Sequence, residues 1–215
     1  MIKKTLYFGN PAYLSLNNKQ LVIRLPEVEK AEAVPDIIKQ SAIKTIPIED
    51  IGVVILDHKQ ITITQALIAA LLDNTVALIS CNDKRMPSGL LLPLQGHNTQ
   101  NERFRKQIEV SLPLKKQLWQ QTVKAKIDNQ ATLLEEVTRR PARSLRRMSL
   151  DVKSGDCDNY EAQAAVYYWR NIFPSIPDFI RGQEEAPPNN LLNYGYAILR
   201  AVVARALVAS GLLPV

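Results

Sequence analysis

The sequence predicts an α+β protein in which a small β-rich part precedes an all-helical part. Short runs rich in Val, Ile, Leu, Tyr and Phe, separated by Asn and Pro, occupy residues 1–93 and are typical of strands. From residue 99 onward, apolar residues recur every three to four positions, as they do along one face of a helix. A polar break that contains Pro93, Gly96, His97 and Asn98 separates the two patterns.

The β-rich part is expected to hold seven strands and one helix. The strands are expected at residues 5–9, 12–16, 20–25, 44–48, 51–56, 75–81 and 89–94. Asn17 and Asn18 favour a hairpin turn after the second strand, because Asn tolerates a positive φ. Residues 26–40 are expected to form a polar loop, and Leu67 and Leu71 have the spacing of a helix at residues 64–73.

The helical part carries a start or stop signal for each expected helix. Residues 99–102 fit a capping box, in which the Thr99 hydroxyl accepts from the N–H of Glu102. Pro113 favours the start of a second helix, and a third is expected near Asp158. A final helix should run from about residue 190 to Gly211, which suits a left-handed C-cap. The predicted domains are residues 1–93 and 99–215, joined by a linker at 94–98.

Composition excludes several protein classes. The 215 residues are 46% apolar and 22% charged, close to the average of soluble globular proteins. Two cysteines, Cys81 and Cys157, with no CxxC spacing are too few for a disulfide framework or a cysteine-based zinc site, and a reducing cytoplasm is the expected setting. Arg200 and Arg205 interrupt the apolar stretch at 191–213, so no membrane span is predicted there.

The net charge of +6 is concentrated in the second half of the chain. Residues 1–93 hold 10 basic and 9 acidic side chains, whereas residues 94–215 hold 17 and 12. Guanidinium groups bind phosphate through paired hydrogen bonds, so a cluster of them favours a nucleic-acid contact. The alternative is a solvated loop between helices. The cluster consists of Arg139, Arg140, Arg143, Arg146 and Arg147.

Glu161 has two interpretations. Glutamate is common at helix starts, and Asp158 three residues earlier strengthens that reading, so Glu161 would only cap the helix. Alternatively, it shares a helix face with Ala165 and Trp169, which would turn its carboxylate toward the core and require a cation or a metal ion beside it. His58 and His97 have no metal-binding spacing, and hydrolase, P-loop and dinucleotide motifs do not occur in the sequence.

Five sequence blocks resemble one protein family. They are TLYFGNPAYLS at residues 5–15, IPIEDIG at 46–52, SGD at 154–156 followed by Glu161, PPNNLLNYGY at 187–196 and SGLLP at 210–214. Over its whole length the chain is similar to the universal CRISPR-associated adaptation endonuclease, the integrase subunit that inserts new spacers, in its type II form.

The resemblance implies a β domain that dimerises and a helical catalytic domain. It implies a homodimer, and two such dimers are bridged by the small second CRISPR-associated protein. Other type II adaptation proteins are further candidate partners. The implied reaction is a transesterification, in which the 3′-hydroxyl of incoming double-stranded DNA attacks a phosphodiester of the repeat array. The arginine cluster at 139–147 then becomes a candidate DNA contact.

The resemblance also assigns Glu161 a catalytic and metal-binding role. The family site binds Mg²⁺ or Mn²⁺ through a glutamate, a histidine and a second acid, and Glu161 matches the glutamate. In the family the other two ligands follow the SGLLP block, and this sequence ends at Val215. We therefore expect a shortened form with an incomplete metal site and no activity. Two alternatives are a non-catalytic dimerising interaction module and an unrelated basic nucleic-acid-binding protein.

Overall fold

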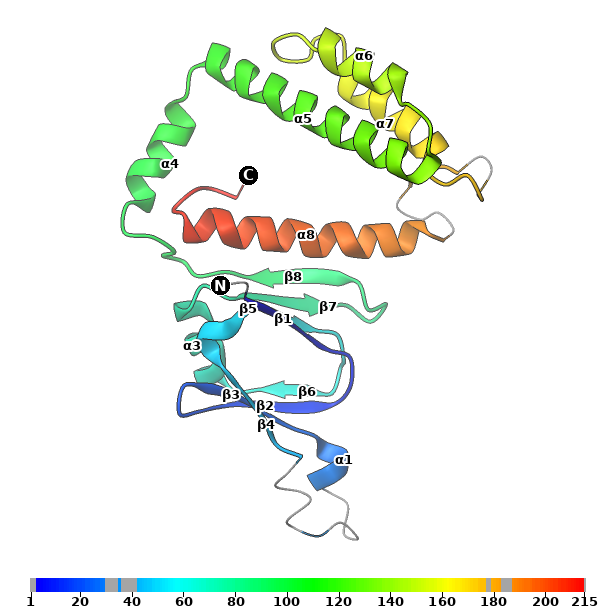
Figure 1. Ribbon diagram of the computed structural model, residues 1–215. Coiled ribbons are helices and arrows are strands. Elements are labelled where there is room, and N and C mark those ends of the chain that lie inside the picture. The colour runs from blue at the N-terminus through cyan, green and yellow to red at the C-terminus, as the bar shows by residue number, and fades with distance from the viewer. Residues whose placement is uncertain (1–2, 30–34, 36–41, 177–178, 183–186, 215) are drawn as a thin grey trace. The chain divides into compact units, whose positions relative to one another are not determined.

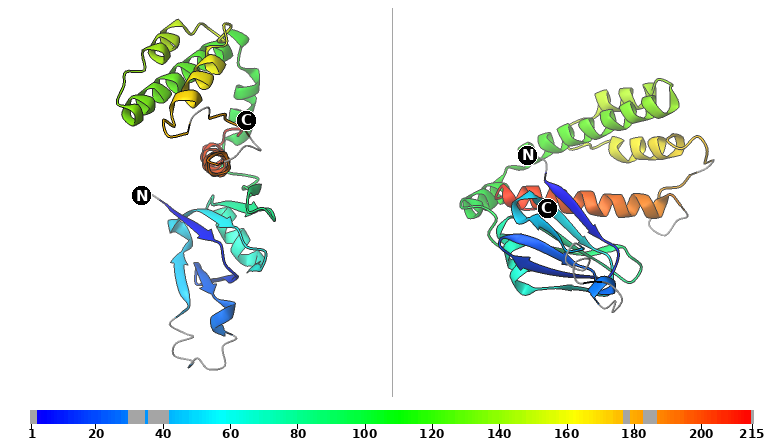
Figure 2. Two further views of the ribbon diagram at one scale, coloured as in Figure 1. Left: turned by 90° about the vertical axis from the view of Figure 1, so that its right-hand side faces the viewer. Right: turned by 60° about the horizontal axis from the view of Figure 1, so that its bottom comes forward.

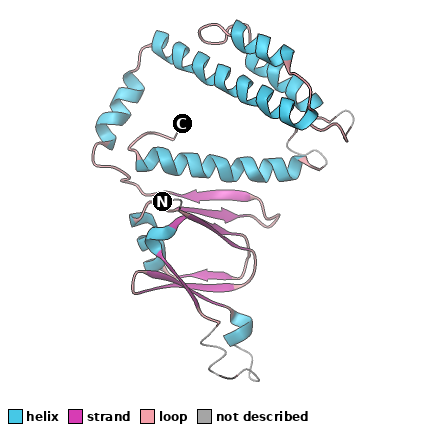
Figure 3. Ribbon diagram, viewed as in Figure 1, coloured by secondary structure: helices cyan, strands magenta, loops and turns pink. Residues whose placement is uncertain are grey.

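The computed structural model describes residues 3–29, 35, 42–176, 179–182 and 187–214 (Figure 1). Its described strands end with β8 at Leu91, and longer helices follow (Figure 3). The α+β fold class is therefore confirmed. By contacts, the chain divides into one compact unit of Met1–Gln107 with Leu191–Val215 and a second unit of Ile108–Asn190. These limits differ from the predicted domains, whose assignment to dimerisation and catalysis stays a prediction.

The first unit contains two four-stranded sheets. The first sheet consists of β1 (Lys4–Phe8), β5 (Ile51–Leu56), β7 (Ala77–Cys81) and β8 (Pro87–Leu91), in that order. The second consists of β4 (Lys44–Pro47), β3 (Gln20–Arg24), β2 (Ala12–Asn17) and β6 (Ile61–Ile63), in that order. β1, β5 and β7 are parallel. β2 and β3 form the predicted hairpin, with positive φ at Asn18 and Lys19.

The central strand β5 is buried on both faces, which explains its continuous apolar sequence. Val54 packs into a core with Leu67 and Leu71 of helix α3 (Gln65–Asp73). Val53 packs on the opposite side in a cluster with Ala201 of α8 (Asn189–Ala209). Most of α8 therefore belongs to the first unit and lies along this sheet (Figure 2).

Helix α4 (Gln100–Glu109) is tied to the end of α8. Arg103 donates to the carbonyl of Ser210, and the Leu213 N–H donates to Gln107 Oε1 at 2.8 Å. Gly211 has φ +68°, so the predicted left-handed cap of the final helix is confirmed. The predicted capping box is wrong, because the Thr99 hydroxyl contacts His97 while Glu102 pairs with Lys106.

Among its described residues, the second unit is built mainly from three helices, α5 (Leu112–Thr138), α6 (Arg143–Asp151) and α7 (Tyr160–Asn171). Their contact is a core that includes Ile127 and Leu134 of α5, Leu145 of α6 and Tyr168 of α7. Helix α6 was not predicted, and it contains three of the clustered arginines. The alternative that the whole cluster is a loop is therefore wrong.

Other elements differ in detail from the predictions. β6 was missed because three residues are too few for a clear alternation. The expected polar loop begins as the short helix α1 (Pro26–Glu29), and residues 30–34 and 36–40 of that loop lie outside the described residues. Residues 48–50 form the short 3₁₀ helix η1 (Ile48–Asp50) rather than the end of a strand.

Within the described residues, α8 has the length and composition of a membrane span. It nevertheless contacts the sheet of the first unit through Ile198, Ala201 and Val202. Arg205 of the same helix donates to the backbone carbonyl of Thr75. These contacts cover only part of the helix, since 6% of its apolar window is buried, and the prediction of no membrane association stays a prediction.

Candidate functional site

The start of α7 is held in place by Asp156. Its carboxylate is buried and accepts from the N–H of Tyr160 at 2.9 Å and from the N–H of Glu161 at 3.0 Å. Gly155, with φ +78°, donates its N–H to the Lys116 carbonyl of α5 at 3.0 Å. Asp156 therefore satisfies two N–H groups at a helix end that would otherwise lack partners.

Glu161 lies at the border of the contact between α5 and α7. Its side chain is 29% exposed, and Oε1 accepts from the ammonium of Lys126 on α5. Ala164 and Tyr168, three and seven residues further along α7, are buried in the helical core. The prediction that this face turns inward agrees with that burial, although the buried positions are shifted by one residue from Ala165 and Trp169.

Each acidic side chain around the start of α7 has a hydrogen-bond or ion-pair partner. Asp158 pairs with Lys153 at 2.8 Å, and this hydrogen bond raises the pKa of Lys153. Asp158 and Glu161 therefore do not form the helix-start pair that their spacing suggested, because each side chain binds a lysine. Because Asp156 binds backbone N–H groups and Glu161 binds Lys126, no acidic side chain of this turn is left without a partner.

The residues described by the structure do not form a complete metal site. No group of three or more His, Cys, Asp or Glu side chains gathers among them closely enough to hold a metal ion. Glu161 supplies a single carboxylate, and one of its oxygens is occupied by Lys126. A hard divalent cation takes six or more oxygen ligands, so these residues alone do not fit Mg²⁺ or Mn²⁺.

The five clustered arginines have different surroundings. Arg139 ends α5 in the left-handed conformation, with φ 55°, and its side chain is exposed. Arg140 follows it, and Arg143 opens α6; both are exposed. Arg147 is exposed and lies 3.8 Å from Asp151, a separation too long for a strong ion pair. These four guanidinium groups face solvent, which suits contact with phosphate.

Arg146 instead joins α6 to α5. Its guanidinium lies 2.7 Å from Glu135 and 3.6 Å from Asp128, and it donates to the Thr132 hydroxyl at 3.0 Å. The hydrogen bond from Arg146, followed by one from the Ala142 N–H, holds the pKa of Glu135 below its ordinary value. Arg146 therefore has a structural role in the described fold, and a phosphate would have to compete with these carboxylates.

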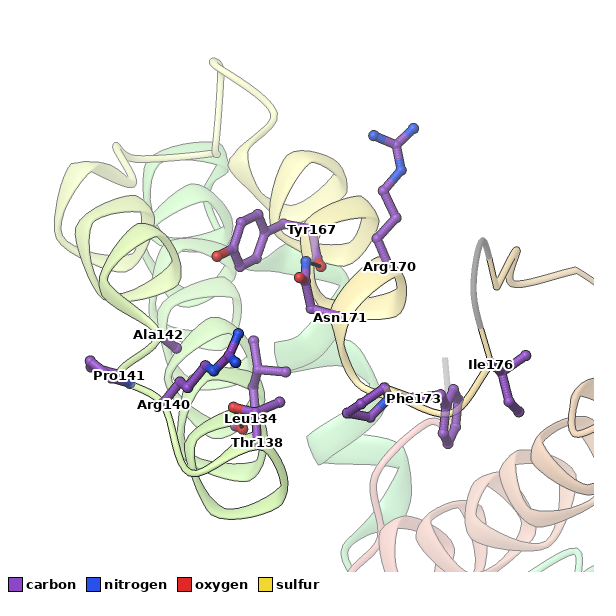
Figure 4. A pocket seen from close by; sticks show the side chains of 11 residues that line it. Leu134, Thr138, Arg140, Pro141, Ala142, Tyr167, Arg170, Asn171, Phe173 and Ile176 are labelled. Carbon is purple, nitrogen blue, oxygen red and sulfur yellow. Dashed lines mark hydrogen bonds between the residues drawn. The ribbon is translucent and has the colours of Figure 1, made fainter.

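A groove of about 450 Å³ lies beside this cluster, between the end of α5 and the end of α7. Leu134, Ala142 and Phe173 make its lining partly apolar, and Arg140 and Arg170 contribute charge. Figure 4 shows that the Arg170 side chain extends away from the rest of the lining. The two arginines therefore do not converge on one point as a phosphate clamp would.

The first unit holds a separate polar cluster at the carboxyl ends of its parallel strands. The Tyr7 hydroxyl at the end of β1 donates to Asp57, which directly follows β5 and is 6% exposed. Burial, together with the neighbouring Asp57 carboxylate, raises the pKa of Cys81 to about 11. The thiol is therefore protonated at neutral pH, which disfavours a nucleophilic role.

The comparisons with known proteins identify the family. The profile described as CRISPR associated protein Cas1 matches residues 6–215. The chain belongs to the Cas1 family. It is 37% identical over all of its 215 residues to the CRISPR-associated endonuclease Cas1 of Neisseria meningitidis serogroup C (strain 8013). The alignment covers 65% of that relative, so the chain spans slightly less than two thirds of its length.

Solved structures show the same fold. A Cas1 protein of Thermotoga maritima matches with a TM-score of 0.70 and 15% identity, over 97% of this chain and 66% of the other. A casposase bound to integration product matches with a TM-score of 0.66 and 19% identity, over 99% and 62%. A chain of a Cas6-RT-Cas1–Cas2 complex matches with a TM-score of 0.69 and 19% identity, over 99% and 24%.

Three residues important to the geometry were not found from the sequence. Lys126 lies 35 positions from Glu161, so no local spacing connects them. Asp156 was overlooked in favour of Asp158, although both precede the same helix. Asn189 of the PPNN block is 1% exposed; its side chain accepts from Arg181 and Gly182 and donates to the Ile180 carbonyl. That block therefore includes a residue that fixes residues 180–182.

Proposed function

We propose that the protein acts on double-stranded DNA in CRISPR spacer acquisition, as part of a Cas1 endonuclease and integrase of the type II form. The reaction would join the 3′ ends of foreign DNA to the repeat array by transesterification. The observation that carries this proposal is the 37% identity, across the whole chain, to a protein named as a Cas1 endonuclease. The casposase, similar in fold, is bound to an integration product, which agrees with DNA joining.

The partners of this activity are part of the proposal. A similar fold occurs in a complex that contains Cas2, which supports the small second CRISPR-associated protein as a partner. We further propose a homodimer, contacts with other type II adaptation proteins, and a cytoplasmic location. The exposed side chains Arg139, Arg140, Arg143 and Arg147 are the proposed DNA contacts, because their guanidinium groups face solvent.

Glu161 is the proposed catalytic carboxylate, and we propose that it is one ligand of a Mg²⁺ or Mn²⁺ ion. Its support is the family resemblance together with its place at the border of the α5–α7 contact, where one carboxylate oxygen is held and the side chain is 29% exposed. The described residues supply no complete ligand set. We therefore propose that the 215-residue polypeptide binds DNA without cleaving or joining it.

An assay with a labelled DNA duplex and Mn²⁺ tests these proposals. The expected result is salt-sensitive binding, with no cleavage or joining above that of Glu161→Ala. Absence of binding at low salt would overturn the proposed DNA function. Cleavage by the unaltered chain that disappears in Glu161→Ala would overturn the incomplete site while supporting the role of Glu161.

A second candidate is a non-catalytic interaction module of the adaptation complex. The single carboxylate at the start of α7 favours it, because catalysis through a divalent ion needs more ligands than the described residues bring together. Size-exclusion chromatography with light scattering separates the two candidates when combined with the duplex assay. A stable dimer that binds no DNA would favour the module.

A further inference from the structure

In the ion pair between Lys126 and Glu161, the lysine ammonium has more N–H donors than it gives to the carboxylate. Lys126 Nζ carries three N–H donors, and its one hydrogen bond within the described part of the chain goes to Glu161 Oε1. The Lys126 side chain is 48% exposed, whereas Glu161 is 29% exposed. The ammonium is therefore the more accessible member of the pair, and its remaining donors are open to a second acceptor from solution.

The pair lies at the edge of the helical core, close to one unsatisfied polar atom. Val123 and Ile127, on either side of Lys126 on α5, are buried in the helical core. Gln130, one helical turn after Lys126, has a buried Oε1 that accepts no hydrogen bond from any described residue. A buried amide oxygen without a hydrogen-bond donor costs stability, and Gln130 places one such group one helical turn from Lys126.

The local charge also permits a phosphate to approach. Asp156 is satisfied by two backbone N–H groups, and Asp158 is paired with Lys153. Glu161 is the remaining acid of this turn, and Lys126 neutralises it. An ammonium in this position can exchange its carboxylate partner for a phosphate, because both are oxyanions that accept from the same donors.

We propose that Lys126 is a DNA-contact residue whose ammonium is shared between Glu161 and a backbone phosphate. The inference rests on the proposed function, and it locates a phosphate position beside Glu161. In the free protein, Lys126 neutralises the carboxylate. When DNA binds, its phosphate competes for the ammonium, and the carboxylate gives up its counter-ion. The more strongly Glu161 binds Lys126, the more it lowers the affinity for DNA.

The test measures the affinity of a labelled duplex by fluorescence anisotropy at several salt concentrations, with folding checked by circular dichroism. Lys126→Gln should weaken binding about tenfold at low salt and reduce the slope of log K against log salt by about one. Lys126→Arg should preserve most of the affinity, because it keeps the charge. Lys124→Gln, on the same helix, is the matched control for loss of one charge.

The competition makes a second and sharper prediction. Glu161→Gln should raise the affinity for DNA. The gain should be several-fold larger than that of Asp158→Asn, which removes an equal charge from the same turn. This gain should disappear in the Lys126→Gln background and persist in the Lys124→Gln background. Equal effects of Lys126→Gln and Lys124→Gln, or a Glu161→Gln gain that is independent of Lys126, would overturn the inference alone. A wild-type chain that binds no duplex would instead overturn the proposed function.

Discussion

The structure assigns the cap of α7 to Asp156 and not to Asp158, and paired substitutions test this directly. Asp156→Ala removes the acceptors of the Tyr160 and Glu161 N–H groups, which lie 2.9 and 3.0 Å from the carboxylate. Because the group is buried, water cannot fully replace it. Loss of such a cap costs about 2 kcal/mol, which lowers the Tm of a unit of this size by roughly 10 °C.

The assay is urea unfolding followed by circular dichroism at 222 nm. Asp156→Asn keeps one oxygen acceptor and should lose about half as much stability as Asp156→Ala. Asp158→Ala removes a pair in which the Asp158 side chain is 42% exposed, so its unfolding free energy should change by no more than about 0.5 kcal/mol. Equal losses for Asp156→Ala and Asp158→Ala would refute this account of how α7 begins.

Three further predictions follow from burial and pKa. The hydrogen bond from Arg146 lowers the pKa of Glu135 below its ordinary value of 4.5, so its stabilisation is present above that pH and lost as pH falls through the lowered pKa. Acid unfolding should therefore show a smaller stability change between about pH 5 and pH 3 in Arg146→Ala; an unchanged profile would contradict the pair. With a pKa of about 11, Cys81 should react with a thiol reagent at pH 8 roughly a hundredfold more slowly than the thiol of a free cysteine, and an equal rate would contradict its burial beside Asp57. Leu145 is 0% exposed, so Leu145→Ala should lower the free energy of unfolding by about 2–5 kcal/mol, and a loss below 1 kcal/mol would argue against the described helical core.

Much of the fold could be predicted because local patterns matched the final packing. The hairpin at Asn18 and the left-handed cap at Gly211 depend on φ values that few residues tolerate, and both were found. Helix α6 was missed because its nine residues carry three arginines, which obscured an apolar stripe with Leu145 in it. β6 was missed because three residues are too few to show the apolar–polar alternation of a strand.

The candidate site was only partly predictable, because its contacts are long-range. Sequence similarity singled out Glu161, but the partner that neutralises it comes from another helix. The arginine cluster was seen as one patch, yet the structure separates Arg146 from the other four by its bonds to Glu135 and Asp128. Charge clustering along the sequence does not reveal which side chains are already paired in the fold.

The most direct test of the account is the salt dependence of duplex DNA binding. The account predicts that the combined variant Arg139→Gln, Arg140→Gln and Arg143→Gln reduces the slope of log K against log salt by about two to three, since each phosphate contact contributes about 0.9. Arg146→Gln should leave that slope nearly unchanged, because its guanidinium is held by Glu135. An unchanged slope in the combined variant, or an equal reduction from Arg146→Gln alone, would contradict the assignment of these arginines to DNA.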